Sequence, residues 1–263
     1  MSIAQEPIGI MLRDWRTRRR LSQLDLALEA EVSTRHLSFV ETGRAHPSRE
    51  MILKLAERME IPLREQNTLL LAGGFAPLYR EQPLESPDLA QAREAVQRIL
   101  TGHEPYPAIA IDRHWHLLAF NQAIGPLLAG IAPELLRPPV NVLRLSLHPD
   151  GLAPRIVNLA EWRAHLFDRL DRQIELTADP ELIALRQELQ GYPFEAAEGH
   201  GHIDALVVPL VLRTGDGELH LFSTTTVFGT PLEITLSELA IEAFFPANAE
   251  TARLLQDLGS SNQ

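Results

Sequence analysis

A group of polar and aromatic side chains follows Ser33 at a spacing that places them on the outer side of a helix. Leu37 and Val40 point the other way, and the outward set comprises Thr34, Arg35, His36, Ser38 and Phe39. An arginine can bond bidentately to guanine O6 and N7, and a threonine or phenylalanine can touch a thymine methyl group. With Ser33 as its N-cap, this segment is predicted to be a recognition helix that reads base edges in the major groove.

Contacts to the phosphate backbone require cationic or amide side chains beside such a helix. Gln23 stands at the start of the preceding predicted helix and Arg44 just beyond the recognition helix, where phosphates should pass. The segment 13–20 carries a net charge of +4 and supplies three more phosphate candidates, Arg16, Arg19 and Arg20. We expect these contacts to fix the register on DNA, whereas the base contacts give specificity.

The apolar residues between these side chains follow the spacing of a helix-turn-helix. With Gln23 as position one, positions 4, 5, 8, 10, 15 and 18 are Leu26, Ala27, Ala30, Val32, Leu37 and Val40. Such positions hold the second helix against the first at a fixed angle. Position nine lies in the turn and is often glycine, because its backbone is left-handed. Here it is Glu31, a strain that a packed domain is expected to tolerate.

Capping residues divide the first 75 residues into short helices. Ser22 begins a capping box, Ser48 and Pro62 mark two further helix starts, and Gly73-Gly74 ends the last helix. With one helix near the N-terminus, the pattern predicts an all-α domain of five helices over residues 1–79. The alternative is a helical bundle that binds only protein. It does not explain so many exposed basic and polar groups around one helix.

The distribution of charge separates this segment from the rest of the chain. The 263 residues carry 24 basic and 35 acidic side chains, a net charge of −11. Residues 1–73 hold 11 basic and 10 acidic side chains, so the negative charge belongs to the remainder. This asymmetry predicts two separate tasks. Nearly all basic residues are arginine, which suits phosphate and base recognition, although a GC-rich genome produces the same bias.

Several classes of protein are disfavoured by composition. The chain has no cysteine, which excludes disulfides and thiolate-ligated zinc. Apolar runs such as 206–212 are far shorter than the ~20 residues that cross a bilayer. The arginines near the start follow the first apolar stretch, whereas in a signal peptide they precede it. The sequence therefore favours a cytoplasmic protein.

The residues beyond the first domain mix helical and strand patterns. Residues 80–87 are polar, contain two prolines and are the predicted linker. Helices are expected over 88–102, 155–174 and 180–190. Strands are expected over 107–112, 115–121, 205–213, 218–226 and 239–245, with a tight turn at 214–217. An antiparallel sheet with helices on one face gives an α+β domain over residues 88–263.

One set of polar residues in this domain has the chemistry of a carboxylate site. Arg155, Asn158 and Trp162 share one face of the helix expected there. Arginine and asparagine are costly to bury unsatisfied, and a bound carboxylate would satisfy them, with His148 as a third donor. The alternative is an internal salt bridge or a helix cap with a nearby acidic residue.

An apolar ligand cavity between sheet and helices would be lined by aromatic residues of the second domain. Phe120, Phe222 and Trp162 are assigned to this cavity. The alternative is that these rings form the core.

Two histidine pairs are candidate metal ligands. His200 and His202 are two residues apart, as are His114 and His116, and side chains at this spacing on a strand can bind one metal ion. The surrounding residues instead favour a loop for the first pair and a hairpin for the second. There is no Walker A motif, no H-E-x-x-H, no G-x-S-x-G and no dinucleotide-type glycine fingerprint. Neither a metal site nor catalytic residues are therefore predicted.

Two family resemblances extend this interpretation. Residues 22–33, 39–44 and 47–48 resemble the xenobiotic-response-element (lambda-repressor-like) helix-turn-helix family over about 60 residues. This resemblance implies a five-helix fold that binds DNA as a dimer, with half-sites about one helical turn (~34 Å) apart. Residues 12–19, 34–41, 147–152 and 155–162 look like the MmyB-like regulators. In that family a PAS-like domain that accommodates a fatty-acid-type ligand follows the helix-turn-helix.

The combined expectation is a dimeric, one-component transcription regulator with a helix-turn-helix domain and a PAS-like sensor domain. A small apolar, possibly acidic effector is expected to bind the sensor domain and change affinity for operator DNA, and repression is favoured over activation. Two alternatives remain: an antitoxin-like module whose acidic body binds a basic protein, and a small-molecule enzyme guided to DNA. Turnover by residues 88–263, or co-purification of a basic protein, would favour them.

Overall fold

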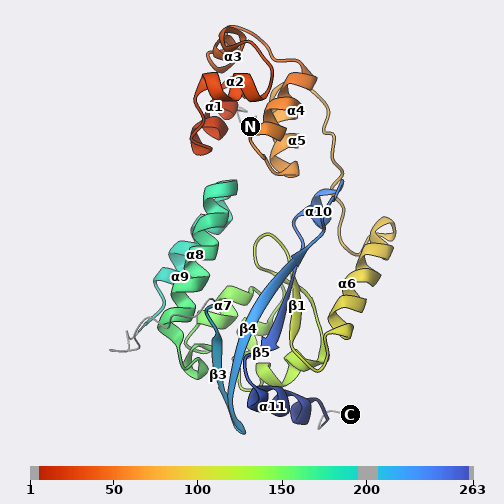
Figure 1. Ribbon diagram of the computed structural model, residues 1–263, viewed down its shortest axis with the longest axis vertical. Coiled ribbons are helices and arrows are strands. Elements are labelled where there is room, and N and C mark those ends of the chain that lie inside the picture. Colours follow the sequence, from red (N-terminus) through yellow and green to blue (C-terminus); the bar gives the residue numbers. More distant parts are fainter. Residues whose placement is uncertain (1–5, 195–206, 261–263) are drawn as a thin grey trace. The chain divides into compact units, whose positions relative to one another are not determined.

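The computed structural model describes residues 6–194 and 207–260 (Figure 1). The chain divides into two compact units, the first formed mainly by the described residues up to Gln82 and the second mainly by those from Pro83 onward. Within these described ranges, no helix is long and apolar enough to span a membrane.

The first unit is all-α, which confirms the predicted five-helix fold. Its helices are α1 (Ile8–Arg18), α2 (Gln23–Glu29), α3 (Thr34–Glu41), α4 (Arg49–Arg58) and α5 (Leu63–Ala72). The predicted capping box is present, because the Ser22 hydroxyl accepts a 3.1 Å hydrogen bond from the backbone N–H of Asp25. Ser48 caps α4 in the same manner, and α5 starts after Pro62 and ends at Gly73. Local sequence signals therefore set most of these boundaries.

The core of the first unit consists of the apolar faces of the five helices. Its fully buried side chains include Leu12, Leu26, Leu37, Ile52 and Leu69. Gly9 lets α1 approach α3 closely, because a Cβ atom at this position would lie 2.2 Å from the backbone oxygen of Val40. Burial of one stripe on each helix is what fixes the position of the short α3.

The second unit contains the predicted antiparallel sheet. Its strands are β1 (Ala108–Ile111), β2 (Leu117–Phe120), β3 (Leu210–Thr214), β4 (Gly217–Val227) and β5 (Ala240–Pro246). They lie in the order β2-β1-β5-β4-β3, with every neighbouring pair antiparallel. Thr214 pairs with Gly217 across the tight turn expected there. These features confirm the α+β class.

Helices and short helical turns surround this sheet. The longer ones are α6 (Ala90–Gly102), α8 (Leu159–Thr177), α9 (Pro180–Gln190) and α11 (Ala249–Ser260), and α7 (Val142–Leu147) and α10 (Ile234–Ser237) are short. Four 3₁₀ turns cover η1 (Pro87–Leu89), η2 (Gln122–Leu128), η3 (Pro133–Leu136) and η4 (Ala153–Arg155). Figure 1 shows α6 on the other side of the strands from α8 and α9, so the helices are not confined to one face.

The start of α8 differs from the prediction. The expected helix began at residue 155, but α8 begins at Leu159, and Arg155 ends a 3₁₀ turn. The backbone N–H of Val157 bonds to the carbonyl of Val211, and Ile156 bridges Leu212 of β3. Pairing with the edge of the sheet therefore holds this segment extended and overrides its helical pattern.

Strand β5 directs large side chains to both faces of the sheet. As the central strand, β5 directs Glu242 and Phe244 to the inner side, while Phe245 stacks on Phe222 from the opposite side with ring centroids 5.4 Å apart.

Candidate functional site

Helices α2 and α3 form the predicted helix-turn-helix. Leu37 and Val40 are 0% and 1% exposed, whereas Arg35 and His36 on the opposite side of α3 are exposed. Ser33 caps the helix by accepting a hydrogen bond from the backbone N–H of His36 at 3.4 Å. The remaining outward residues, Thr34, Ser38 and Phe39, are partly exposed. The predicted recognition face is thus open along the first two turns of α3.

The turn between the two helices has the left-handed backbone expected at position nine. Glu31 adopts φ = +50°, and the next residue, Val32, donates its backbone N–H to the carbonyl of Ala27. The Glu31 carboxylate lies 2.8 Å from the ammonium group of Lys54. The hydrogen bond from Lys54 lowers the pKa of Glu31. A non-glycine residue is therefore accommodated here with its side chain directed to α4.

Three of the predicted DNA-contacting cations remain available. The guanidinium of Arg35 lies over the Phe39 ring, with its Cζ atom 5.3 Å from the ring centroid, which orients the side chain along α3. The side chains of Arg35, Arg44 and Arg20 form no ion pair or hydrogen bond within residues 6–194 and 207–260. Arg44 and Arg20 are both exposed. Such cations can meet phosphates or bases without first breaking an ion pair or a hydrogen bond within the described residues.

Arg16 and Gln23, both predicted to contact phosphates, form hydrogen bonds within the protein. The Arg16 guanidinium forms a bidentate pair with Glu41, at 2.7 and 2.9 Å, and also donates to the carbonyl of Leu21. The Gln23 side-chain amide donates to the same Glu41 carboxylate at 2.7 Å. The hydrogen bond to Glu41 raises the pKa of Arg16, although partial burial opposes the shift. In the protein without DNA, Arg16 is therefore a positioning residue, and its predicted phosphate contact stays a prediction.

This Arg16–Gln23–Glu41 cluster joins the first three helices. Arg16 comes from α1, Gln23 from α2 and Glu41 from the last turn of α3. Glu41 is only 5% exposed, so its charge depends on these donors. The cluster fixes the orientation of the recognition helix, and sequence reasoning missed Glu41 because its partners are 18 and 25 residues away.

Arg19 is also held inside the first unit. Its Nε atom donates to the carbonyl of Met59 at 2.7 Å, and its guanidinium lies over Trp15, 5.3 Å from the ring centroid. Burial lowers the pKa of Arg19 from its ordinary value. The Arg19 side chain thus caps the C-terminal end of α4 by bonding to a carbonyl there. This geometry does not support the phosphate role predicted for Arg19.

A cavity of about 100 Å³ lies in the second unit between the inner side of the sheet and the surrounding helices. Its walls are almost entirely apolar, with contributions from β1, β3, β4, β5, α7, α8 and η2, and include Ile109, Trp115, Leu143, Trp162, Leu166 and Leu212. Two polar side chains, Ser146 and Glu242, complete the lining. The cavity therefore suits a small molecule that is mostly apolar.

Of the aromatic residues predicted to bind a ligand, Trp162 lines this cavity and the other two do not. Its indole N–H donates to the Ser146 hydroxyl at 2.9 Å. Phe120 pairs with the lining residue Ile109 from the edge strand β2, but it is 48% exposed and is not part of the lining. Phe222 is one residue from the lining residue Leu221, so the period of two places it on the opposite side of β4. The assignments of Phe120 and Phe222 to the ligand site are therefore corrected.

The predicted carboxylate site is not assembled. The Arg155 guanidinium donates to the carbonyls of Leu127, Ala129 and Arg213 at 2.9, 3.1 and 3.2 Å. Asn158 bonds to the backbone of Pro209 and Val211, and His148 accepts from the backbone N–H of Asp150. Because the segment is not helical from residue 155, these side chains do not share a helix face. Their polar atoms instead fix loops and the edge of the sheet.

Glu242 and Arg169 form a buried ion pair that sequence reasoning missed. Glu242 on β5 is 4% exposed, and its Oε1 atom lies 2.5 Å from Nη1 of Arg169 on α8. The Ser223 hydroxyl donates to the same oxygen at 3.0 Å. The Arg169 guanidinium also lies over Trp115, 4.8 Å from the ring centroid. A single acidic residue within the apolar segment 239–245 was the available signal for this pair.

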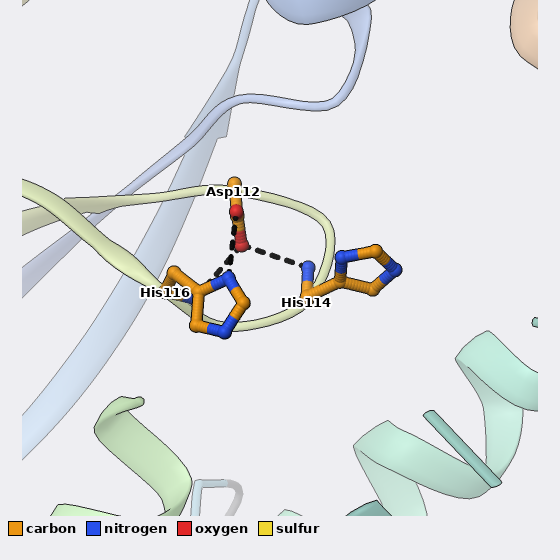
Figure 2. Close-up of side chains that lie close together, drawn as sticks. All are labelled: Asp112, His114 and His116. Atoms are coloured by element: carbon orange, nitrogen blue, oxygen red, sulfur yellow. Dashed lines mark hydrogen bonds and ion pairs between the residues drawn. The ribbon is translucent and has the colours of Figure 1, made fainter. Parts of the chain in front are cut away.

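Asp112, His114 and His116 come together at the turn between β1 and β2 (Figure 2). The Asp112 Oδ1 atom accepts from the backbone N–H groups of His114 and His116, both at 2.8 Å, and Oδ2 bonds to His116 Nδ1 at 3.0 Å. His114 Nε2 bonds to Asp179 at the start of α9. These bonds give the three side chains a role in shaping the hairpin. His200 and His202 lie outside the described residues.

Comparisons with known proteins match both units. The family model of the MmyB-like transcription regulator ligand binding domain matches residues 92–258. A helix-turn-helix family model matches residues 12–66. The first describes a domain of a transcription regulator. A search of the curated proteins gives no significant match.

Two solved structures show partial similarity. The restriction-modification controller protein C.AhdI from Aeromonas hydrophila is 37% identical to this chain, covering 22% of this chain and 89% of its own, with a TM-score of 0.22. An RNA-binding light-oxygen-voltage receptor is 15% identical over the whole of this chain and 63% of its own, with a TM-score of 0.29.

The family assignment therefore rests on the two models, which lie in the order helix-turn-helix then ligand-binding domain. The model of the ligand-binding domain covers well over half of the chain, and the helix-turn-helix model falls within α1–α5. The chain belongs to the MmyB-like transcription regulators and is a DNA-binding transcription regulator.

Proposed function

We propose that this regulator is a cytoplasmic repressor that binds operator DNA as a homodimer, with α3 in the major groove. The observation that carries this is the contrast on α3, where the anchoring residues are buried and the base-reading set is open. Arg35 is assigned to a base edge, with Thr34 and Phe39 beside it. Arg44 and Arg20 are assigned to phosphates.

The second part of the proposal concerns control by a ligand. A small apolar molecule in the cavity of the PAS-like second unit changes the affinity of the dimer for its operator, without a further cofactor. The apolar walls support this assignment. The family resemblance suggests a fatty-acid-type molecule. Coupling requires that the ligand binds the DNA-competent and incompetent states with different affinity.

Base and phosphate roles on the first unit are separable by mutation. Arg35→Ala is expected to cost about 1–3 kcal/mol at one operator base pair and to relax specificity there, because a bidentate base contact is lost. Arg44→Ala is expected to weaken operator and random duplexes equally and to reduce the salt slope by about one. Titration of both duplexes at several salt concentrations measures both effects.

Arg58→Ala is a matched control, because Arg58 is an exposed arginine in the last turn of α4 outside the assigned set. It should leave the affinity for operator DNA within a factor of about two. Equal losses on operator and random duplexes for both Arg35→Ala and Arg44→Ala would contradict the assigned roles.

Ligand control is testable by occupying the cavity with a larger side chain. Leu166 is 3% exposed and lines the cavity, so Leu166→Phe should fill part of the space. We expect an extracted or added apolar ligand to change operator affinity about 5- to 150-fold in the wild-type protein, and the response to be largely lost in the variant. Calorimetric titration of the ligand and fluorescence anisotropy of labelled operator measure both properties.

The matched control is Leu118→Phe, which enlarges a partly exposed leucine of the edge strand β2 that is not part of the cavity lining. It should retain the full response to the ligand. A wild-type protein whose operator affinity is the same with and without saturating ligand would rule out ligand control.

A further inference from the structure

Two histidines and two carboxylates lie together at the turn between β1 and β2. Asp112, His114 and His116 belong to the turn, and Glu181 approaches His114 from the first turn of α9. Imidazole nitrogens combined with carboxylate oxygens are a donor set typical of Zn²⁺, whereas Ca²⁺ and Mg²⁺ prefer oxygen alone. We propose that these four side chains bind a Zn²⁺ ion. This site is distinct from the proposed DNA contacts, and the proposed ligand control does not require it.

The Asp112 carboxylate is already oriented for this role. Its Oδ1 atom accepts two backbone hydrogen bonds, both 2.8 Å long, from His114 and His116, while Oδ2 lies 3.0 Å from Nδ1 of the His116 ring. Figure 2 shows the carboxylate directed into the turn that carries both histidines. Hydrogen bonds of this kind hold the carboxylates that bind metals in proteins. They fix one oxygen of Asp112 and present the other.

The His114 ring is held in the tautomer that a metal needs. Its Nε2 atom lies 2.9 Å from Oδ2 of Asp179. A carboxylate oxygen accepts hydrogen bonds, so the proton of the neutral ring is on Nε2 and the lone pair is on Nδ1. Nδ1 lies 3.4 Å from Oε2 of Glu181. A histidine that binds a metal usually donates its other N–H to a carboxylate in this way.

The spacing of the donor atoms is close to that around a bound ion. One donor atom from each of Asp112, His114 and His116 lies within 4.8 Å of the others. In tetrahedral Zn²⁺ sites, bonds of about 2.0 to 2.1 Å place the ligand atoms roughly 3.4 Å apart. All three residues are partly exposed, so small rotations of their side chains can close this difference. The proton of His116 then moves from Nδ1 to Nε2, and the metal replaces the hydrogen bond to Asp112.

The surrounding charges favour a cation over an anion. Asp112 and Glu181 are accompanied by Asp179 and Glu238, and Arg113 lies 3.3 Å from Asp179 and 3.8 Å from Glu238. These four carboxylates and one guanidinium carry a net charge of −3 when both histidines are neutral. A divalent ion therefore reduces the repulsion among the carboxylates.

Calorimetric titration of the full chain with ZnCl₂ tests the site. We expect the wild type to bind one Zn²⁺ ion per chain at its tightest site. His116→Ala should weaken this binding more than about 100-fold, because loss of a ligand costs more than the 10- to 100-fold typical of its hydrogen-bond partners. His220→Ala is the matched control, because His220 lies 3.8 Å from a single carboxylate, Glu218, and it should bind Zn²⁺ like the wild type.

The other histidine pair of the sequence is tested in the same titration. The double variant His200→Ala with His202→Ala should keep the tightest site. Loss of Zn²⁺ binding in this variant, undiminished binding in His116→Ala, or no saturable binding by the wild type would overturn the inference. None of these results would affect the DNA-binding role or the apolar ligand.

Asp179→Asn separates positioning of His114 from folding. Asparagine can still cap α9 by accepting from the backbone N–H of Glu181, as Asp179 Oδ1 does at 2.9 Å. Its amide N–H₂ group would then face His114 Nε2 and favour the tautomer with the proton on Nδ1. We expect Zn²⁺ to bind about 10- to 100-fold more weakly. NMR signals of the imidazole nitrogens in the wild type should shift on Zn²⁺ addition at His114 and His116. If these two rings do not respond, the inference fails even where His116→Ala does not fold.

Discussion

Replacing Glu41 with alanine is expected to destabilise the helix-turn-helix unit by about 3–5 kcal/mol, because it leaves the buried Arg16 guanidinium without its carboxylate. The side chains of Arg16 and Glu41 are 13% and 2% exposed, so water cannot replace the lost partner well. Gln23 loses its acceptor in the same substitution. Since domains of this size have total stabilities of about 5–15 kcal/mol, the unit should be largely unfolded near physiological temperature. Urea titration followed by circular dichroism measures the loss.

Two controls isolate the role of the buried charge. Glu94 forms an ion pair with Arg98 in which both side chains are more than 60% exposed, and Glu94→Ala should cost less than about 1 kcal/mol. The double variant Arg16→Met with Glu41→Leu removes both charges and should recover most of the stability. If Glu41→Ala is no more destabilising than Glu94→Ala, the cluster does not hold α3 in place.

Arg169→Met is expected to destabilise the second unit by a similar amount, about 3–5 kcal/mol, because Glu242 is then a buried carboxylate without a cation. The side chains of the pair are 19% and 5% exposed. The loss should appear in the transition of the second unit, while the helix-turn-helix unit keeps its own stability. Hydrogen exchange resolved by residue distinguishes the two transitions.

Arg172 provides the matched control for this substitution. It lies one turn further along α8, is exposed, and its Nε atom donates to the backbone carbonyl of Asp168 in the same helix. Arg172→Met should leave stability within about 0.5 kcal/mol of the wild type. If Arg169→Met lowers stability no more than Arg172→Met does, Arg169 acts as an ordinary surface residue.

The first unit was predictable because its signals are local. Ser22 and Ser33 act on backbone groups within three residues, and the spacing of Leu37 and Val40 defines the buried side of one helix. Even the left-handed turn at Glu31 followed from its position in the motif. Such features depend on short-range geometry, so one sequence is enough to place the recognition face.

The interactions that complete the sites join residues far apart in the chain. Arg16 meets Glu41 across 25 residues and Arg169 meets Glu242 across 73, and no periodic pattern reports such pairings. The carboxylate site predicted around Arg155 failed for the same reason. Its neighbour Val157 pairs with β3, which is 54 residues away and replaces the expected helix with extended chain. Tertiary pairing overrode local propensity.

The placement of the tryptophans gives the two units separate optical signals. Of the three in the chain, Trp115 and Trp162 face the cavity, whereas Trp15 packs in the first unit beneath Arg18 and Arg19. With phenylalanine at position 15, all indole emission would come from the cavity walls. Entry of a molecule into that space would then change the intensity or wavelength of the light, and occupancy could be followed in real time without a label.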